Sequence, residues 1–162
     1  MRAPTGRLAA CLVFLVASAT IAGALASQHV FGLVPCKLCL LQRWPYYVGV
    51  PLAALTMVPP SGSTASRTGL LLLSLVFLAS IGLGAYHAGV EWGWFLGPSD
   101  CGGGFGAAPS GVGDFMRSLD GIRVVSCTEA AWRFLGLSLA GWNTLVSLGL
   151  AGLAGSAAWA GR

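Results

Sequence analysis

The sequence predicts an all-α membrane protein in which four helices form an antiparallel transmembrane bundle. The chain is 56% hydrophobic and 9% charged, whereas an ordinary soluble domain carries about 25% charged residues. Its mean hydropathy is +0.78. A soluble domain of 162 residues could not keep this much apolar surface away from water, and a chain this apolar is not typical of disorder. The lipid bilayer is therefore the expected environment.

The positions of the charges predict the four spans. The charged residues leave four uncharged runs of 29, 23, 23 and 28 residues, and a helix needs about 20 apolar residues to cross a bilayer. We expect one membrane domain over residues 1–162. Its spans are expected at about 8–28, 40–58, 69–88 and 138–160. Glycines of the last span, including Gly149, Gly152 and Gly155, suit close helix packing.

The outer loops are expected at about 29–39, between the first two spans, and at about 89–137, between the last two. With four spans, both termini and the turn near residue 60 share one side. That side carries Arg2, Arg7, Arg67 and Arg162 and no acidic residue. Because basic residues in short loops favour the cytoplasm, both termini are expected to be cytoplasmic and the two loops to lie outside it.

The N-terminal segment has an alternative interpretation. Arg2 and Arg7, the apolar run and the Ala24-Leu25-Ala26 triplet together resemble a signal peptide and its cleavage site. The apolar stretch is longer than in most signal peptides, which favours a retained span. Cleavage would leave three spans and the same outer position for the loops.

The second outer loop is the polar part of the chain, because residues 91–133 contain 8 of the 14 charges. Within it, Val112, Phe115, Met116 and Leu119 recur at helical spacing, which predicts a short amphipathic helix on the membrane surface. The 9 basic residues of the chain form no cluster. We therefore expect no nucleic-acid partner.

Four of the five cysteines lie in the two outer loops. Cys36 and Cys39 form a C-x-x-C motif in the first loop, and Cys101 and Cys127 lie in the second. A compartment outside the cytoplasm permits disulfides. Cys11 falls inside the first span and is expected to be a small buried apolar residue.

The C-x-x-C motif favours redox chemistry. A disulfide between Cys36 and Cys39 closes so small a loop that it would add little stability by chain entropy, whereas this spacing is typical of exchanging dithiols. Zinc sites usually pair two C-x-x-C motifs, so no metal is expected. Haem attachment needs His after the second Cys, where Leu40 stands. A relay of two dithiol pairs is favoured, with structural disulfides as the open alternative.

Polar residues near the span ends are candidate neighbours of the motif. Arg43 follows Cys39 by four residues, so on one helix the two would share a face. Its guanidinium would then lower the thiol pKa, or hold a ligand's carbonyl oxygen, or simply anchor the helix at the interface. Gln42 is expected at the same boundary. His87 and Glu91 are also four residues apart, which suits a polar pair near a ligand headgroup; the favoured alternative is an interfacial histidine that caps the helix end, and neither residue is expected to be catalytic.

The chain resembles the DsbB family, the bacterial inner-membrane disulfide bond formation proteins. The resemblance rests on the segment PCKLCLLQR, which spans Pro35 to Arg43, on the two-cysteine outer loop, and on WRFLGL after Cys127. It covers nearly the whole chain. It implies an antiparallel four-helix bundle in the inner membrane, with cytoplasmic termini and periplasmic cysteine loops.

The resemblance also implies an activity, that of a membrane thiol:quinone oxidoreductase. Such a protein reoxidises a DsbA-like, thioredoxin-fold periplasmic partner and passes the electrons to ubiquinone or menaquinone. By this resemblance the partner's thiolate would attack Cys101, whose mate Cys127 would exchange with Cys36. Cys39 would face the quinone and donate to it as a thiolate, with Arg43 beside the ring. A DsbA-type oxidant has a reduction potential of about −120 mV, so its reoxidation needs a more oxidising acceptor. Quinone, which dissolves in the bilayer, is such an acceptor.

Two other functions compete with this one. The vitamin K epoxide reductase type is also a small redox bundle, but its quinone-side motif follows the loop pair, whereas Cys36 and Cys39 precede it here. The other is a non-catalytic four-span scaffold with structural disulfides, which would show no thiol cycling.

One departure from the DsbB pattern is that His87 directly follows Tyr86, where many members carry an acidic residue first. This departure puts the ligand contacts of the third span in doubt.

Overall fold

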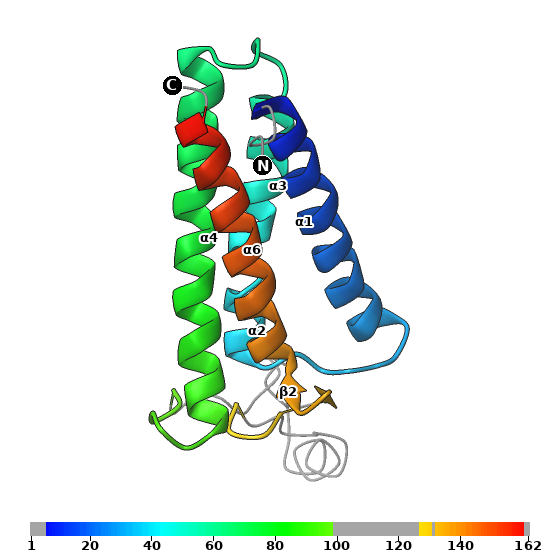
Figure 1. The fold of residues 1–162 in the computed structure, drawn as a ribbon. Coiled ribbons are helices and arrows are strands. Elements are labelled where there is room, and N and C mark those ends of the chain that lie inside the picture. Colours follow the sequence, from blue (N-terminus) through cyan, green and yellow to red (C-terminus); the bar gives the residue numbers. More distant parts are fainter. Residues whose placement is uncertain (1–5, 99–126, 131, 161–162) are drawn as a thin grey trace, which may run out of the picture.

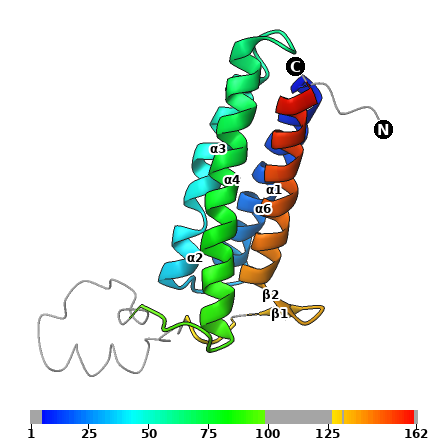
Figure 2. The ribbon, with the colours of Figure 1, turned by 60° about the vertical axis from the view of Figure 1, so that its left-hand side comes forward.

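The computed structural model describes residues 6–98, 127–130 and 132–160. Four long helices in this part pack into one bundle, in which α4 contacts α3 and α6, and α1 contacts α3 and α6 (Figure 1). Both views show successive long helices running in opposite directions (Figures 1 and 2). The helices are α1 (Gly6–His29), the short α2 (Lys37–Leu41), α3 (Trp44–Thr56), α4 (Thr64–Glu91) and α6 (Leu139–Ala160).

The bundle has the side-chain distribution of a membrane protein. Two of its helices, α1 and α4, are long and apolar enough to cross a membrane. On α1 the buried positions include the small residues Ala9, Ala10 and Ala17, while Leu8 and Leu15 are exposed. Small residues let membrane helices approach closely, and large apolar side chains turned outward suit contact with lipid. The fold is consistent with an all-α membrane protein.

The second predicted span is interrupted in the structure. Instead of one helix over 40–58, the chain forms α2, a turn at Gln42 and Arg43, and then α3. Pro45 occupies the first turn of α3, where its missing N–H and fixed φ favour a helix start. The observed α3 has 13 residues, about 20 Å of helix. The break separates the C-x-x-C motif from the helix that follows it.

A short β-hairpin, with two residues in each strand, lies where the sequence analysis expected a loop without regular structure. Strands β1 (Arg133–Phe134) and β2 (Leu137–Ser138) pair antiparallel. The turn between them places Leu135 at φ 52° and Gly136 at φ 81°, and two positive φ values are what a tight two-residue hairpin requires. The sequence Leu-Gly is not a strong hairpin signal, which explains why the hairpin was missed. The amphipathic helix predicted around Val112 to Leu119 lies outside the described residues.

Close approach of α4 and α6 depends on a glycine that the sequence analysis did not single out. A side-chain carbon on Gly84 would collide with Thr144 Oγ1 of α6. Among the glycines expected to pack, Gly155 does face α4, with Ser74 Oγ 3.2 Å from its ideal Cβ position. The same expectation is wrong for Gly149 and Gly152, which have nothing within 4 Å of that position.

We expect Gly84→Ala to lower the melting temperature of the detergent-solubilised protein. Overpacking of a tight contact typically costs about 1–3 kcal/mol. The matched control is Gly82→Ala on the same helix, where nothing lies within 4 Å of the new methyl group. Because Ala is favoured over Gly in a helix by up to about 1 kcal/mol, this control should unfold at the same or a higher temperature. Equal destabilisation by both changes, followed by circular dichroism, would contradict this packing.

Candidate functional site

The two cysteines of the C-x-x-C motif lie together at the start of α2. Cys36 caps this helix, and its Sγ accepts a hydrogen bond from the Cys39 backbone N–H at 3.2 Å. A second hydrogen bond, 2.7 Å long, joins the two sulfur atoms. Both residues are free cysteines, and Cys36 is only 6% exposed. The structure therefore presents the motif as a hydrogen-bonded dithiol.

The negative charge of this dithiol is favoured on Cys36. The hydrogen bond with the Cys39 thiol lowers the pKa of Cys36 to about 4; burial opposes this shift, and His87 and the Cys39 N–H reinforce it. The same sulfur–sulfur hydrogen bond, together with burial, raises the pKa of Cys39. A low-pKa cysteine beside a protonated partner is typical of thiol exchange.

Arg43 is turned toward α1 and not toward Cys39. Its Nη1 donates to Gln28 Oε1 at 2.6 Å, and its Nη2 donates to the Ala24 carbonyl at 3.3 Å. The turn between α2 and α3 removes the shared helix face that the sequence spacing suggested. Arg43 is not among the groups that shift the pKa of Cys39, which the hydrogen bond with Cys36 and burial raise.

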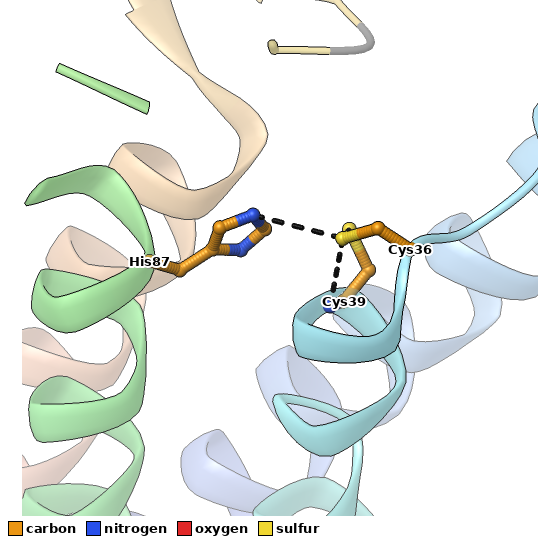
Figure 3. A group of neighbouring side chains, drawn as sticks. All are labelled: Cys36, Cys39 and His87. Atoms are coloured by element: carbon orange, nitrogen blue, oxygen red, sulfur yellow. Dashed lines mark hydrogen bonds between the residues drawn. The ribbon is translucent and has the colours of Figure 1, made fainter. Parts of the chain in front are cut away.

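His87 faces the dithiol from the last turns of α4 (Figure 3). Its Nε2 lies 3.6 Å from Cys36 Sγ and 3.8 Å from Glu91 Oε1. The predicted polar pair of His87 and Glu91 is thus confirmed, but the contact with Cys36 was not foreseen. The other carboxylate oxygen of Glu91 is buried without a hydrogen-bond partner. Cys36, Cys39 and His87 bring three possible metal ligands within 4.8 Å of one another.

A chain of buried hydrogen bonds leads from His87 into the bundle. His87 Nδ1 lies 2.5 Å from Gln42 Nε2, and Gln42 Oε1 accepts from Asn143 Nδ2 at 2.8 Å. Asn143 Oδ1 accepts from the Tyr46 hydroxyl at 2.6 Å. Beyond Tyr46 the chain continues through the hydroxyl groups of Ser147 and Ser80. Sequence analysis placed Gln42 at the membrane boundary and did not identify Asn143.

A cavity of about 690 Å³ opens beside the motif. Residues of α1, α2, α3, α4 and α6 line it, and most of its wall is apolar. Its polar lining includes Cys36, Cys39, Arg43 and His87. A mostly apolar cavity of this size with a few convergent polar groups is typical of a small-molecule site.

Cys127 is packed against the same motif. It is disulfide-bonded and 1% exposed, within a buried cluster that includes Cys36. Cys39 packs against this cluster. The structure therefore brings together three of the four cysteines predicted to react. The fourth, Cys101, lies outside the described residues.

Comparisons with known proteins identify the family of this chain. The family model "Disulfide bond formation protein DsbB" matches residues 6–157. The chain is 36% identical to Disulfide bond formation protein B of Marinobacter nauticus, over 86% of each chain. It is 33% identical to the protein of that name from Polaromonas sp., over 88% of this chain and 85% of the relative. No solved structure matches. The chain belongs to the DsbB family of disulfide bond formation proteins.

Proposed function

We propose that this protein is a membrane thiol:quinone oxidoreductase that reoxidises a DsbA-like periplasmic dithiol protein and passes the electrons to quinone. Membership of the DsbB family supports disulfide formation as the activity. The observation that carries the proposal is the buried contact between the Cys36–Cys39 dithiol and the disulfide-bonded Cys127, beside a large apolar cavity that Cys36 and Cys39 line. At this point the dithiol lies beside a possible disulfide-exchange partner and is open to an apolar electron acceptor in the cavity.

The thiol steps balance as a series of exchanges. A partner thiolate attacks Cys101 and breaks its bond to Cys127, and the second partner thiol then displaces Cys101 to complete the partner's disulfide. Cys127 attacks Cys36 in the oxidised motif and releases Cys39 as a thiolate, and Cys101 then attacks Cys127 and releases Cys36. Each exchange breaks one S–S bond and forms another. The loop disulfide is restored and the motif is left as the dithiol seen in the structure.

Quinone would be the terminal acceptor: closing the motif's disulfide supplies two electrons, and quinol formation needs two protons, one from the Cys39 thiol and one from solvent. The cavity residues suit such a molecule. The Arg43 guanidinium has five N–H donors and is held in place by two bonds to α1. Charged donors of this kind stabilise negative charge that develops on a carbonyl oxygen. The apolar remainder of the wall suits an isoprenoid tail. Ubiquinone and menaquinone both meet these requirements.

The proposed membrane arrangement has four spans. α1, α4 and α6 would each supply one, and the second, at about 40–58, would contain the shorter α3. The end of the bundle where α1 begins and α6 ends would face the cytoplasm, and the end that carries the C-x-x-C motif would face the periplasm (Figure 2). This arrangement in the bacterial inner membrane puts the cysteines beside both a periplasmic partner and the membrane quinone pool.

Arg43→Ala tests the quinone site. We expect the apparent KM for quinone to rise by about tenfold or more, which corresponds to about 1.4 kcal/mol of lost binding, while the KM for the dithiol partner changes little. Steady-state quinone reduction, with each substrate varied in turn, measures both constants. Arg67→Ala is the matched control, because Arg67 bonds to the Ala158 carbonyl of α6 and does not line the cavity. Equal changes in the two KM values, or no change, would reduce Arg43 to a helix anchor.

A further inference from the structure

The interaction between His87 and Cys36 depends on which ring nitrogen carries the proton. A neutral imidazole has one N–H donor and one acceptor nitrogen. If Nε2 is protonated, the ring donates to the Cys36 sulfur, which lies 3.6 Å away. If Nδ1 is protonated, the lone pair of Nε2 faces the sulfur, and a thiolate there is repelled.

The amide of Gln42 selects between these two tautomers. Its nitrogen can only donate and its oxygen can only accept. The oxygen is occupied by the Asn143 amide nitrogen, which donates to it at 2.8 Å. The Gln42 nitrogen is therefore the atom that faces His87 Nδ1. A donor in this position requires Nδ1 to be the acceptor, which leaves the proton on Nε2.

Asn143 is oriented in turn by Tyr46. The Tyr46 hydroxyl donates to Asn143 Oδ1 at 2.6 Å, so the Asn143 nitrogen is the end that remains for Gln42. Every donor in the series points the same way, from the hydroxyl through two amides to the imidazole. Such chains of hydrogen bonds strengthen one another in a low-dielectric interior. His87 and Gln42 are both buried, at 3% and 7% exposure.

We propose that Gln42 and Asn143 are positioning residues, whose linked amides hold His87 in the tautomer that points its Nε2–H at Cys36. The proposal rests on the proposed thiol:quinone function for its biological meaning, but its geometry stands on the described contacts alone. While Nε2 carries this proton, His87 cannot ligate a metal through that nitrogen.

The direct test is the tautomer itself. The chain contains 2 histidines, so a His29→Gln protein labelled with ¹⁵N-histidine leaves His87 as the one observed ring. We expect long-range proton–nitrogen correlation spectra of the reduced, detergent-solubilised protein to show Nε2 protonated and Nδ1 unprotonated. In the Asn143→Leu variant the Nδ1-protonated form should appear. A wild-type ring protonated on Nδ1 would overturn the proposal without any variant.

The second readout is the ionisation of Cys36, followed by thiolate absorbance near 240 nm across pH. Other titratable or charged groups near this sulfur are Cys39 and Lys37 on its own helix and Glu91 on α4; Arg43 and Glu129 line the same cavity. These groups are unchanged in the variants. We expect Gln42→Met and Asn143→Leu to raise the midpoint by at least one pH unit, because the ring that loses its amide partner no longer holds its Nε2–H against this sulfur.

The matched control is Thr144→Val, next to Asn143, because the Thr144 hydroxyl donates to the Ala140 carbonyl of its own helix. It should leave the midpoint where it is. Folded Gln42→Met and Asn143→Leu proteins with the wild-type midpoint and tautomer would refute the positioning role. Neither readout uses quinone or a partner, so this inference and the proposed function can fail separately.

Discussion

Replacing Cys36 with serine is expected to abolish quinone reduction by a dithiol donor, with a loss of roughly 10³-fold or more, because a hydroxyl group cannot form or exchange a disulfide. Cys36 contacts both its C-x-x-C partner and the buried cluster that contains the loop cysteine. Its sulfur bonds to Cys39 and faces His87, and it shares a buried cluster with Cys127. The loss should appear in the quinone absorbance of detergent-solubilised protein supplied with a reduced DsbA-like protein.

Cys11→Ser is the matched control for this change. Cys11 is a free, partly exposed cysteine of α1 and does not line the cavity beside the motif. Its removal should leave the rate within about twofold of wild type, as is usual for a substitution away from a functional site. A folded Cys36→Ser protein that still reduces quinone with the same donor would exclude the proposed relay.

The second large effect is expected in the pH dependence of Cys36 alkylation. The hydrogen bond with Cys39 lowers the pKa of Cys36 from an ordinary cysteine value of 9.0 to about 4. Because the thiolate is the reactive form, iodoacetamide labelling should be half-maximal near pH 4, fall below it, and be flat from about pH 6 upward. At pH 6 an ordinary thiol would be ionised to only about one part in a thousand, so the difference is large.

Cys39→Ala separates the causes of this shift. It removes the thiol whose hydrogen bond is the largest contribution to the low pKa of Cys36, so the labelling midpoint should move up toward its ordinary value. Mass spectrometry of the Cys36 peptide, in a Cys11→Ser background, identifies the labelled site. A wild-type midpoint near pH 9 would contradict the hydrogen-bonded dithiol. Stabilising a thiolate also stabilises the reduced motif, which helps the oxidised motif to accept electrons from the reduced loop cysteines.

Much of the helical fold could be predicted from the spacing of the charges alone. The last window, about 138–160, matches α6 at Leu139–Ala160, and the first, about 8–28, matches α1 at Gly6–His29. The second failed because its window ran across Gln42 and Arg43, two polar residues that interrupt the apolar segment. The spacing of charges does not show a helix break, and the effect of Pro45 is on backbone geometry.

The candidate site was only partly predictable. The redox motif could be found because C-x-x-C is a local pattern with a chemical meaning. His87 could not be placed beside Cys36, because 51 residues separate them, and Asn143 could not be placed beside Gln42, because 101 residues separate those two. Both contacts follow from the packing of α4 and α6 against α2 and α3. The available signal was an isolated polar side chain in an apolar helix, which in membrane proteins often marks a functional position.

The measurement that tests the central claim most directly is electron transfer from a reduced DsbA-like protein to quinone by the purified protein. Quinol formed and partner thiols lost should be counted together, with ubiquinone and menaquinone analogues as acceptors. The account predicts turnover with one quinol formed for each pair of thiols oxidised. A folded sample that oxidises several dithiol donors without forming quinol, or that shows no turnover with any donor and acceptor, would contradict it.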